Sequence, residues 1–258
     1  MSTSAIGWIN AMKTATLLAS SQEPLWPVSN LVGDQGAPSA AWQTLSGALT
    51  GVLLTVTPLA RTTFRSIGAF RTNLSSTGTM IVQAYTNPGL VLVATAPTVN
   101  FANGQAVAVF AADTAADVLH ITFANAGNPD NHLNIPLVFA GPMWFPTANH
   151  AWSSTMGRDD LNDTVVTRGG QTFLNLRATS RRWNIVFDSI RSNEAYTQID
   201  VLDRYSRIGS NVLFIPDTTS ADMQSEATFG IWKASADISF PLTTATRRSW
   251  AATLSERL

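Results

Sequence analysis

One stretch in the second half of the chain shows the clearest pattern of hydrophobic and polar positions. Two short apolar runs rich in β-branched and aromatic residues, at 183–187 and 212–215, predict strands. Between them, apolar residues recur at spacings of four, three and three, which places them along one face of a helix. These residues are Ala195, Ile199, Leu202 and Tyr205. The pattern therefore predicts one helix near residues 192–208, with a strand on either side of it.

Short apolar runs separated by turn sequences dominate the rest of the chain. In residues 1–141 the runs follow one another at intervals of roughly 8–15 residues, which is typical of a β-sandwich or jelly roll. Asn103-Gly104, between two such runs, is the strongest single hairpin signal. The predicted strands cover residues 41–45, 51–57, 63–71, 79–85, 90–95, 106–110, 118–124 and 133–139.

A change in composition marks a domain boundary near Gly141-Pro142, where an aromatic segment follows. We predict a jelly-roll β-sandwich over residues 1–141 and a second domain, a β-barrel or β-sandwich that carries the helix, over residues 142–258. The protein is thus expected to be all-β, or mainly β with one helix. In the second domain the polar residues 157–163 predict a loop, and strands are expected at 164–168, 172–178, 227–233, 238–242 and 248–254.

Charge is distributed unevenly along the chain. Residues 1–150 contain four basic and five acidic side chains, whereas residues 151–258 contain twelve of each. A soluble surface so poor in charge is unusual, because charge is a main protection against self-association. The first part is therefore expected to work inside an assembly. A compositional bias towards Ala and Thr would produce the same pattern.

Composition excludes several classes of function. The chain has no cysteine, so disulfides and thiolate zinc sites are excluded. A net charge of −1 argues against nucleic acid as a partner, since no excess of Lys or Arg is present to neutralise phosphates. No run of about 18 apolar residues occurs, so we expect no membrane insertion. The N-terminus lacks the basic region of a signal peptide, and none is expected.

Two sets of motifs resemble tail proteins of tailed bacteriophages. The first set resembles the N-terminal discoidin-like (galactose-binding-like) jelly roll of tail-tip and baseplate proteins, and comprises Pro27-Val-Ser-Asn-Leu31, Trp42, Ile67-Gly-Ala-Phe-Arg-Thr-Asn-Leu74, Gly78 and Tyr85. The second set is similar to the barrel domain of distal-tail-type proteins, which form rings around the tail axis. It comprises Thr167-Arg-Gly-Gly-Gln-Thr-Phe173, Arg181-Arg-Trp183, Ile199, Leu202, Gly209, Leu213-Phe-Ile-Pro-Asp217 and the segment from Arg247 to Glu256.

The resemblance implies a structural component of a phage tail tip or baseplate, made in the host cytoplasm and located in the virion. The implied partners are copies of the chain itself, in a ring of three-fold or six-fold symmetry, and other phage tail proteins. Trp and Arg are typical anchors of protein interfaces, and the planar guanidinium suits contacts with Asp and Glu of neighbours. The candidate interface residues are Trp144, Trp152, Arg168, Arg177, Arg181, Arg182, Arg247 and Arg248.

Catalytic and metal-binding motifs are absent from the sequence. The three histidines stand alone, without the spacing of a metal site, and the acidic residues Asp159, Asp160 and Asp163 lack the pattern of a calcium loop. No nucleophile elbow and no P-loop is present. We predict no enzyme activity, no metal and no cofactor. A polysaccharide hydrolase, which needs only two facing carboxylates, remains the weaker alternative, with Asp188, Glu194, Asp200 and Glu226 as candidates.

Glycan binding is the main alternative function. Sugar sites stack a ring on an exposed aromatic side chain and bind its hydroxyls with polar side chains of neighbouring loops. One predicted loop gathers Trp26, Asn30, Asp34 and Trp42. The opposing interpretation is that both tryptophans close the sandwich as core residues. A second predicted loop gathers Asn128, Asp130, Asn131 and His132.

Overall fold

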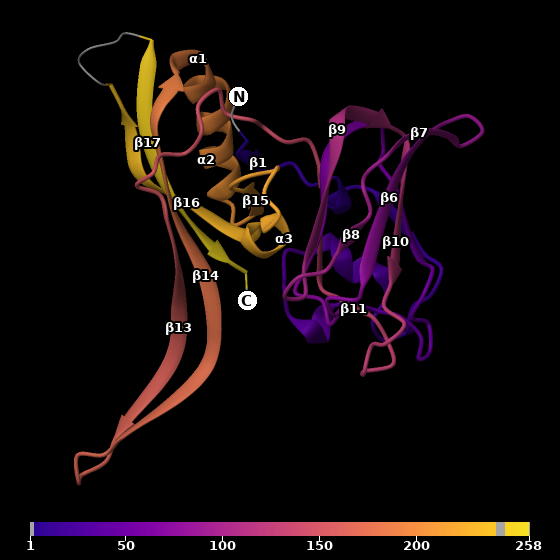
Figure 1. Ribbon diagram of the computed structural model, residues 1–258, viewed down its shortest axis with the longest axis horizontal. Coiled ribbons are helices and arrows are strands. Elements are labelled where there is room, and N and C mark those ends of the chain that lie inside the picture. Colours follow the sequence, from indigo (N-terminus) through magenta and orange to yellow (C-terminus); the bar gives the residue numbers. More distant parts are fainter. Residues whose placement is uncertain (1–2, 241–245, 258) are drawn as a thin grey trace. The chain divides into compact units, whose positions relative to one another are not determined.

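A computed structural model describes residues 3–240 and 246–257. The chain forms two compact units that are not continuous in sequence. The N-terminal unit consists of residues 3–145 together with the later segment 213–227. The C-terminal unit consists of residues 146–212 and the chain from Thr228 onwards. The division into domains at 141/142 stays a prediction. The chain is mainly β with one principal helix, as the sequence predicts (Figure 1).

The N-terminal unit is an antiparallel β-sandwich of the jelly-roll type. One sheet has the order β2-β4-β10-β6-β7, with β8 also paired to β6, and a second sheet has the order β12-β5-β9. A short pair, β11-β3, completes it. The strands are β2 (Thr16–Ala19), β3 (Trp42–Gln43), β4 (Val52–Thr57), β5 (Thr62–Phe70), β6 (Thr79–Thr86), β7 (Val91–Thr95), β8 (Val99–Asn100), β9 (Ala106–Ala116), β10 (Val118–Ala124), β11 (Asn134–Ile135) and β12 (Leu137–Gly141).

The alternation of buried and more exposed side chains along the strands explains why they form a sandwich. In β4 every second residue is buried, and β6 and β10 alternate in the same way. Successive side chains of a strand point to opposite faces, so each strand gives one face to a common core. The eight strands predicted for this part are found, although the one expected at 133–139 is interrupted at Pro136, which has no N–H to donate. Asn103 and Gly104 form the predicted hairpin turn, both at positive φ.

Short elements complete the N-terminal unit. The 3-10 helices are η1 (Ala11–Lys13), η2 (Val28–Val32) and η3 (Pro38–Ala40), and α3 is a single turn (Met223–Glu226). Strand β1 (Ala5–Gly7) pairs with residues 213–215 of β15 (Asn211–Ile215). Gln224 of α3 binds the backbone of Val107 on β9 in both directions: its Oε1 accepts from the Val107 N–H at 2.5 Å, and its Nε2 donates to the Val107 carbonyl at 2.8 Å.

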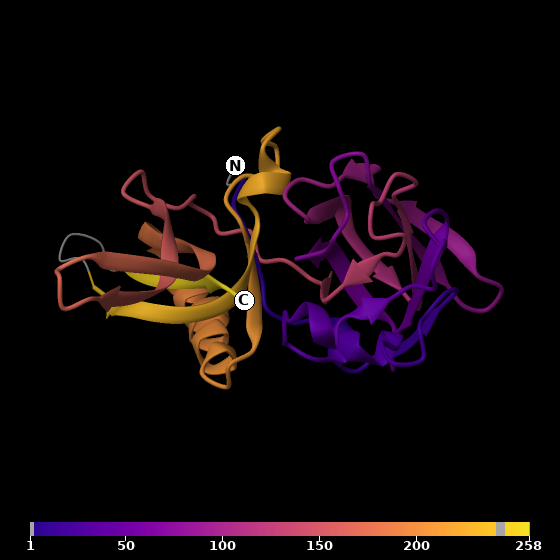
Figure 2. The ribbon, with the colours of Figure 1, turned by 90° about the horizontal axis from the view of Figure 1, so that it is seen from below.

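The C-terminal unit is one antiparallel sheet with a helix against one face (Figure 2). Its strands run in the order β16 (Thr228–Ser239), β17 (Arg247–Glu256), β14 (Thr172–Arg191) and β13 (Thr155–Val166). The helix is a continuous run of α1 (Ser192–Glu194), a π-helical turn (Ala195–Ile199) and α2 (Asp200–Ser206), which confirms the prediction of one helix near residues 192–208. Its buried side chains include Ala195, Ile199 and Leu202, three of the four that predicted it.

Three predictions for the C-terminal unit are wrong. The sheet of described residues is open and does not close into a barrel. Residues 157–163, predicted as a loop, lie within β13, and the separate strands expected at 172–178 and 183–187 are one 20-residue strand, β14. The polar residues 157–163 were interpreted as a loop because this part of the sheet has no buried face. Without a buried face, polar and apolar residues do not alternate along the strand. The strand expected at 238–242 ends at Ser239 in β16, and residues 241–242 lie outside the described residues.

The β13–β14 hairpin extends beyond the rest of its own sheet (Figure 1). The last residue of β14 towards the hairpin tip that pairs with β17 is Arg182, opposite Ser255. Beyond it, β13 and β14 pair only with each other as far as the turn at 167–171. Residues 158–180 are therefore a two-stranded ribbon, which we call the arm.

Candidate functional site

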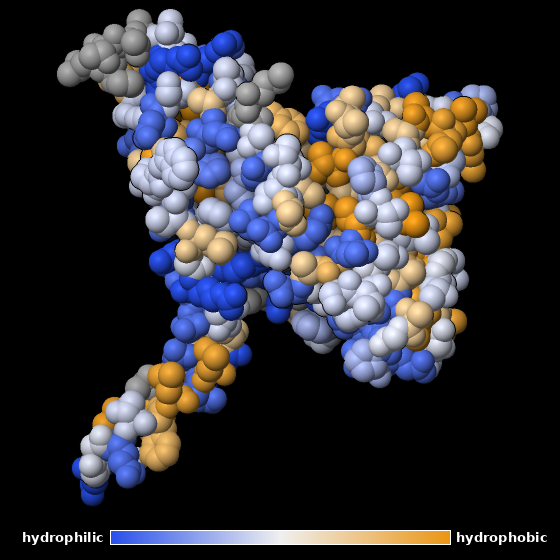
Figure 3. All heavy atoms as spheres, in the orientation of Figure 1, coloured by the Kyte–Doolittle hydropathy of each residue, from blue (hydrophilic) through white to orange (hydrophobic). Residues whose placement is uncertain are grey.

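The arm exposes an unusual number of apolar side chains. Six of them have more than half of their surface exposed, between 56% and 65%: Leu161, Val165, Val166, Phe173, Leu174 and Leu176. Figure 3 shows apolar side chains along this extension among hydrophilic ones. Exposed apolar residues that stand singly are ordinary, but a contiguous group indicates a binding surface.

Strand register distributes these six residues over both faces of the ribbon. Phe173 lies opposite Val165, and Leu174 lies opposite Thr164. Alternation then places Val165, Phe173 and Leu161 on one face, and Val166, Leu174 and Leu176 on the other. A bulge at the step from Leu161 to Asn162 locally re-aims the strand. Neither face has a covering layer among the described residues of its unit, so both remain available.

Two of the candidate interface arginines already bind carboxylates of the same chain. Arg181 forms a bidentate pair with Glu256, with Nη2 to Oε1 at 2.8 Å and Nε to Oε2 at 3.0 Å. Arg182 lies 2.8 Å from an oxygen of Asp159 on β13. The Arg181–Glu256 pair joins β14 to β17, and the Arg182–Asp159 pair joins β14 to β13, both at the base of the arm. Their use between subunits stays a prediction.

The remaining candidate interface residues lie in different surroundings. Arg168, in the turn, and Arg177, at the bulge, are exposed on the arm, and Trp152 is fully exposed in the C-terminal unit. Trp144 belongs to the N-terminal unit, where it exchanges backbone hydrogen bonds with Ile6. Arg248 is buried, with its guanidinium 4.3 Å from the centre of the Phe240 ring, and Arg247 is treated below.

The polar groups of the first predicted glycan loop have protein partners. The Asn30 amide donates to the Ala41 carbonyl at 2.9 Å, and Asp34 lies 2.6 Å from the Lys13 ammonium. Trp42 is fully buried and donates from Nε1 to a backbone carbonyl, as the core interpretation requires. Trp26 is half-buried. Of the two tryptophans, only Trp26 has a ring surface that a sugar can reach.

The second predicted loop is held together by Asn73, which the sequence analysis missed. Its amide donates to Asp130 at 2.9 Å and to the His132 carbonyl at 3.0 Å, and its carbonyl oxygen accepts from the Asn134 N–H at 2.8 Å. Asn128 is buried and donates to the backbone of Asn73 at 3.1 Å. In the sequence, Asn73 stood out only as part of the Ile67–Leu74 motif, for which no such role was predicted. These contacts make the loop a rigid unit.

The structure brings the two predicted loops side by side. The Gln43 N–H donates to the Trp26 carbonyl, and Gln43 lies opposite Asn134 in the β3–β11 pair. On the neighbouring turn, the Asn131 amide donates to the Ser46 hydroxyl at 2.7 Å. Trp26 and the loop at 128–132 therefore belong to one end of the sandwich.

A cavity of about 550 Å³ lies in the C-terminal unit between the helix and β16. Burial raises the pKa of Asp203 from its ordinary value of 3.8 to about 6, opposed by the nearby Arg207 and reinforced by Asp200. Its Oδ1 is buried without a hydrogen-bond partner. The lining contains two basic residues, Arg207 and Lys233, and two acidic residues, Asp203 and Asp237, so the numbers of basic and acidic groups are equal. This balance favours no particular charged ligand.

Metal clusters and membrane-spanning helices are absent from the described part of the chain. Among residues 3–240 and 246–257, no three His, Asp or Glu side chains come together where they could hold a metal ion. In the same residues, no helix has the length and apolar character needed to cross a membrane.

Comparisons with known proteins give similarity only to solved structures. No protein-family model matches the chain, and no curated protein matches it. The family 32 carbohydrate-binding module of C. perfringens NanJ, solved with galactose, is similar over 52% of this chain and 98% of that module, with 20% identity and a TM-score of 0.42. A fucose binding module of Streptococcus pneumoniae covers 52% of this chain and 96% of its own, at 15% identity and a TM-score of 0.41. Chitosan-binding module 1 of a chitosanase/glucanase from Paenibacillus sp. IK-5 covers 52% and 99%, at 15% identity and a TM-score of 0.43. About half of this chain is thus similar to these carbohydrate-binding modules.

Proposed function

We propose that this chain is a structural subunit that associates with copies of itself through the arm. One observation carries the proposal: six apolar side chains, each more than half exposed, lie on a ribbon with no covering layer in its own unit. An isolated two-stranded ribbon is only marginally stable in water, and three or more strands are needed for independent stability. A neighbouring subunit would supply the missing layer.

A second copy of the same chain suits the arm in charge and in backbone chemistry. Residues 158–180 contain three basic side chains (Arg158, Arg168 and Arg177) and three acidic ones (Asp159, Asp160 and Asp163), so arms of identical subunits do not repel one another. β13 is also the last strand of its sheet, with one backbone edge open. An open edge is a template for pairing with a strand of another chain.

The finer proposal is that the assembly is a ring in the tail tip or baseplate of a tailed phage virion, with three or six subunits and other tail proteins as neighbours. It rests on the motif resemblance at Thr167–Phe173 and Arg247–Glu256. In its support, a hairpin that extends beyond its sheet is suited to reach the next subunit. Electron microscopy of the purified protein should show closed rings, and a discrete dimer instead would contradict this finer proposal.

Size-exclusion chromatography with light scattering tests self-association. The wild-type chain should form an oligomer, and Leu174→Asp combined with Leu176→Asp should reduce it to monomers. Burying a leucine contributes about 1.5–3 kcal/mol, so the loss of two should weaken association by at least about 100-fold. Leu25→Asp, at an 80%-exposed leucine of the N-terminal unit, is the matched control. A wild-type chain that stays monomeric at high concentration would refute the proposal.

Glycan recognition by the N-terminal unit is the second candidate. The observation that favours it is the half-buried Trp26 at the same end of the sandwich as the polar loop 128–132. A glycan array with the intact chain should then identify a ligand, and Trp26→Ala should abolish binding while circular dichroism stays unchanged. Trp42→Ala cannot serve as this test, because Trp42 is fully buried and its removal would destabilise the core. No bound glycan on the array, or binding that survives Trp26→Ala, would reject this site.

A further inference from the structure

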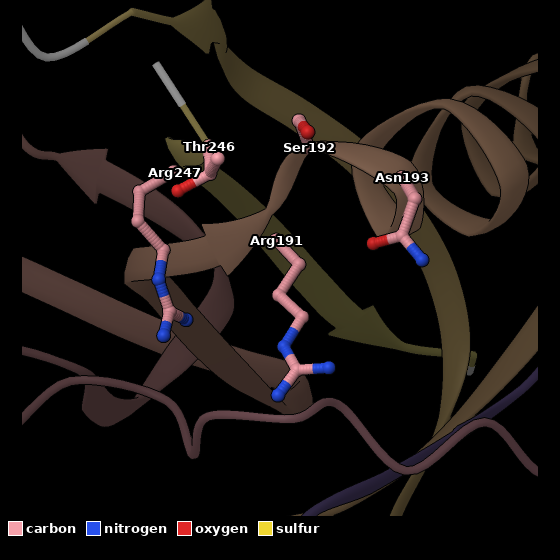
Figure 4. A pocket seen from close by; sticks show the side chains of 5 residues that line it. All are labelled: Arg191, Ser192, Asn193, Thr246 and Arg247. Atoms are coloured by element: carbon pink, nitrogen blue, oxygen red, sulfur yellow. The ribbon is translucent and has the colours of Figure 1, made fainter. Parts of the chain in front are cut away.

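Two arginines line a cavity of about 260 Å³ at the ends of two neighbouring strands of the C-terminal sheet. Arg191 ends β14, Arg247 begins β17, and Ser192, Asn193 and Thr246 complete the lining. In Figure 4 both guanidinium groups extend the same way from their strands, while the smaller polar side chains lie near the strand ends and the start of the helix. None of these five residues takes part in the arm.

The register of the sheet places the two arginines opposite each other. Arg191 and Arg247 are directly opposite each other in the antiparallel β14–β17 pair. Opposed residues in such pairs have Cα atoms about 4.5–5.5 Å apart, and like charges there are destabilising. The next residue, Arg248, points to the opposite face and lies over Phe240, so it does not belong to this pair.

The described parts of the chain do not neutralise this pair of charges. In residues 3–240 and 246–257, no carboxylate forms an ion pair with either side chain. Arg247 donates once, to the Ser189 carbonyl at 3.2 Å. The nearby Glu194 is already engaged: Oε1 accepts from the N–H and hydroxyl of Thr147 at 3.0 and 2.7 Å, and Oε2 accepts from the Arg191 backbone N–H at 3.3 Å.

We propose that this cavity binds an oxyanion, a phosphate or carboxylate group carried by a small molecule. A guanidinium presents its donors in a planar fork that matches both groups, and two forks side by side would hold one anion from two directions. The hydroxyls of Ser192 and Thr246 and the amide of Asn193 supply neutral partners for the rest of the ligand. Binding would also remove the repulsion between the strands. This proposal is independent of self-association.

Titration of the intact chain with sodium phosphate and with sodium glucuronate, at constant ionic strength, tests the proposal by NMR of the arginine Nε–H signals. Saturable shifts of the Arg191 and Arg247 signals are expected, with no response to neutral D-glucose. Arg191→Gln and Arg247→Gln should each weaken binding at least tenfold. Arg61→Gln, at an exposed arginine of the N-terminal unit that changes the net charge equally, should leave it unaltered. A response to phosphate alone would assign a phosphate ligand, and a response to glucuronate alone an acidic sugar.

Three results would overturn the proposal. The first is the absence of saturable shifts with both anions, and the second is equal weakening in Arg61→Gln. The third is loss of self-association in Arg191→Gln without any anion binding, which would assign the arginines to a protein contact. If a glutamine variant does not fold, the wild-type signals decide alone, because they report directly on the two guanidinium groups.

Discussion

Replacing Asp203 by Asn tests how much an ionised carboxylate in the cavity between the helix and β16 destabilises the folded chain. The pKa of Asp203 is raised from 3.8 to about 6, mainly by burial. The folded state therefore holds the proton more tightly than the unfolded state, and ionisation favours unfolding. The contribution of the Asp203 carboxyl to the free energy of unfolding is fully present below about pH 4. It is lost as the pH rises through about 6.

The magnitude follows from the difference between the two pKa values. About two pKa units at about 1.4 kcal/mol each set an upper limit near 3 kcal/mol. Asp203 is only half-buried, so water screens much of this penalty, and about 1 kcal/mol is the expected effect. Asp203→Asn carries no titrating group, so at pH 7.5 it should be more stable than the wild-type chain by about 1 kcal/mol. At pH 4 the difference should vanish.

Urea unfolding followed by circular dichroism at 222 nm is the suitable assay, because the principal helix lies in the same unit as Asp203. Measurements at pH 4, 6 and 7.5 give the difference in unfolding free energy between variant and wild type. Asp113→Asn, at an exposed carboxylate of the N-terminal unit, controls for the change in net charge. A difference that does not change with pH, or a variant less stable at pH 7.5, would refute the reasoning.

Three further predictions concern packing. Gly230→Ala should prevent the C-terminal sheet from forming, because a Cβ there would lie 2.0 Å from the Ser255 carbonyl oxygen; loss of β-signal in circular dichroism checks this, and a normally folded variant would contradict it. Gln224→Ala should cost about 2–3 kcal/mol, since it removes two hydrogen bonds to Val107, and unchanged unfolding by urea would show that α3 contributes little. Phe64→Ala should cost about 3–5 kcal/mol in the same assay because Phe64 is fully buried in the core, and a cost below about 1 kcal/mol would mean that the core collapses around the gap.

Sequence patterns predicted the elements that have one buried face. The strands of the N-terminal sandwich alternate because one side of each meets the core, and Ala195, Ile199 and Leu202 recur at helical spacing for the same reason. The arm has solvent on both faces, so its polar residues at 157–163 resembled a loop. The period of a strand is visible in a sequence only where burial selects it.

The candidate sites were less predictable than the fold. Sequence separation hides the approach of Arg191 to Arg247, which depends on the register of β14 and β17. Asn73 was missed because its role depends on three backbone and side-chain partners more than 50 residues away. Trp42 could be read as exposed or buried, since a tryptophan near turn residues fits either position. Each of these features is decided by contacts between distant segments.

The return of residues 213–227 to the N-terminal unit has a consequence for biosynthesis. A nascent chain at the ribosome presents residues 3–145 first, while β15 follows and Gln224 emerges some 80 residues later. At about 5–20 residues per second, this is a delay of roughly 4–16 seconds. During that time the side of β1 that pairs with β15 and the Val107 backbone groups that bind Gln224 have no partner. The N-terminal sandwich is thus completed only after most of the second unit has been translated, which couples the maturation of the two.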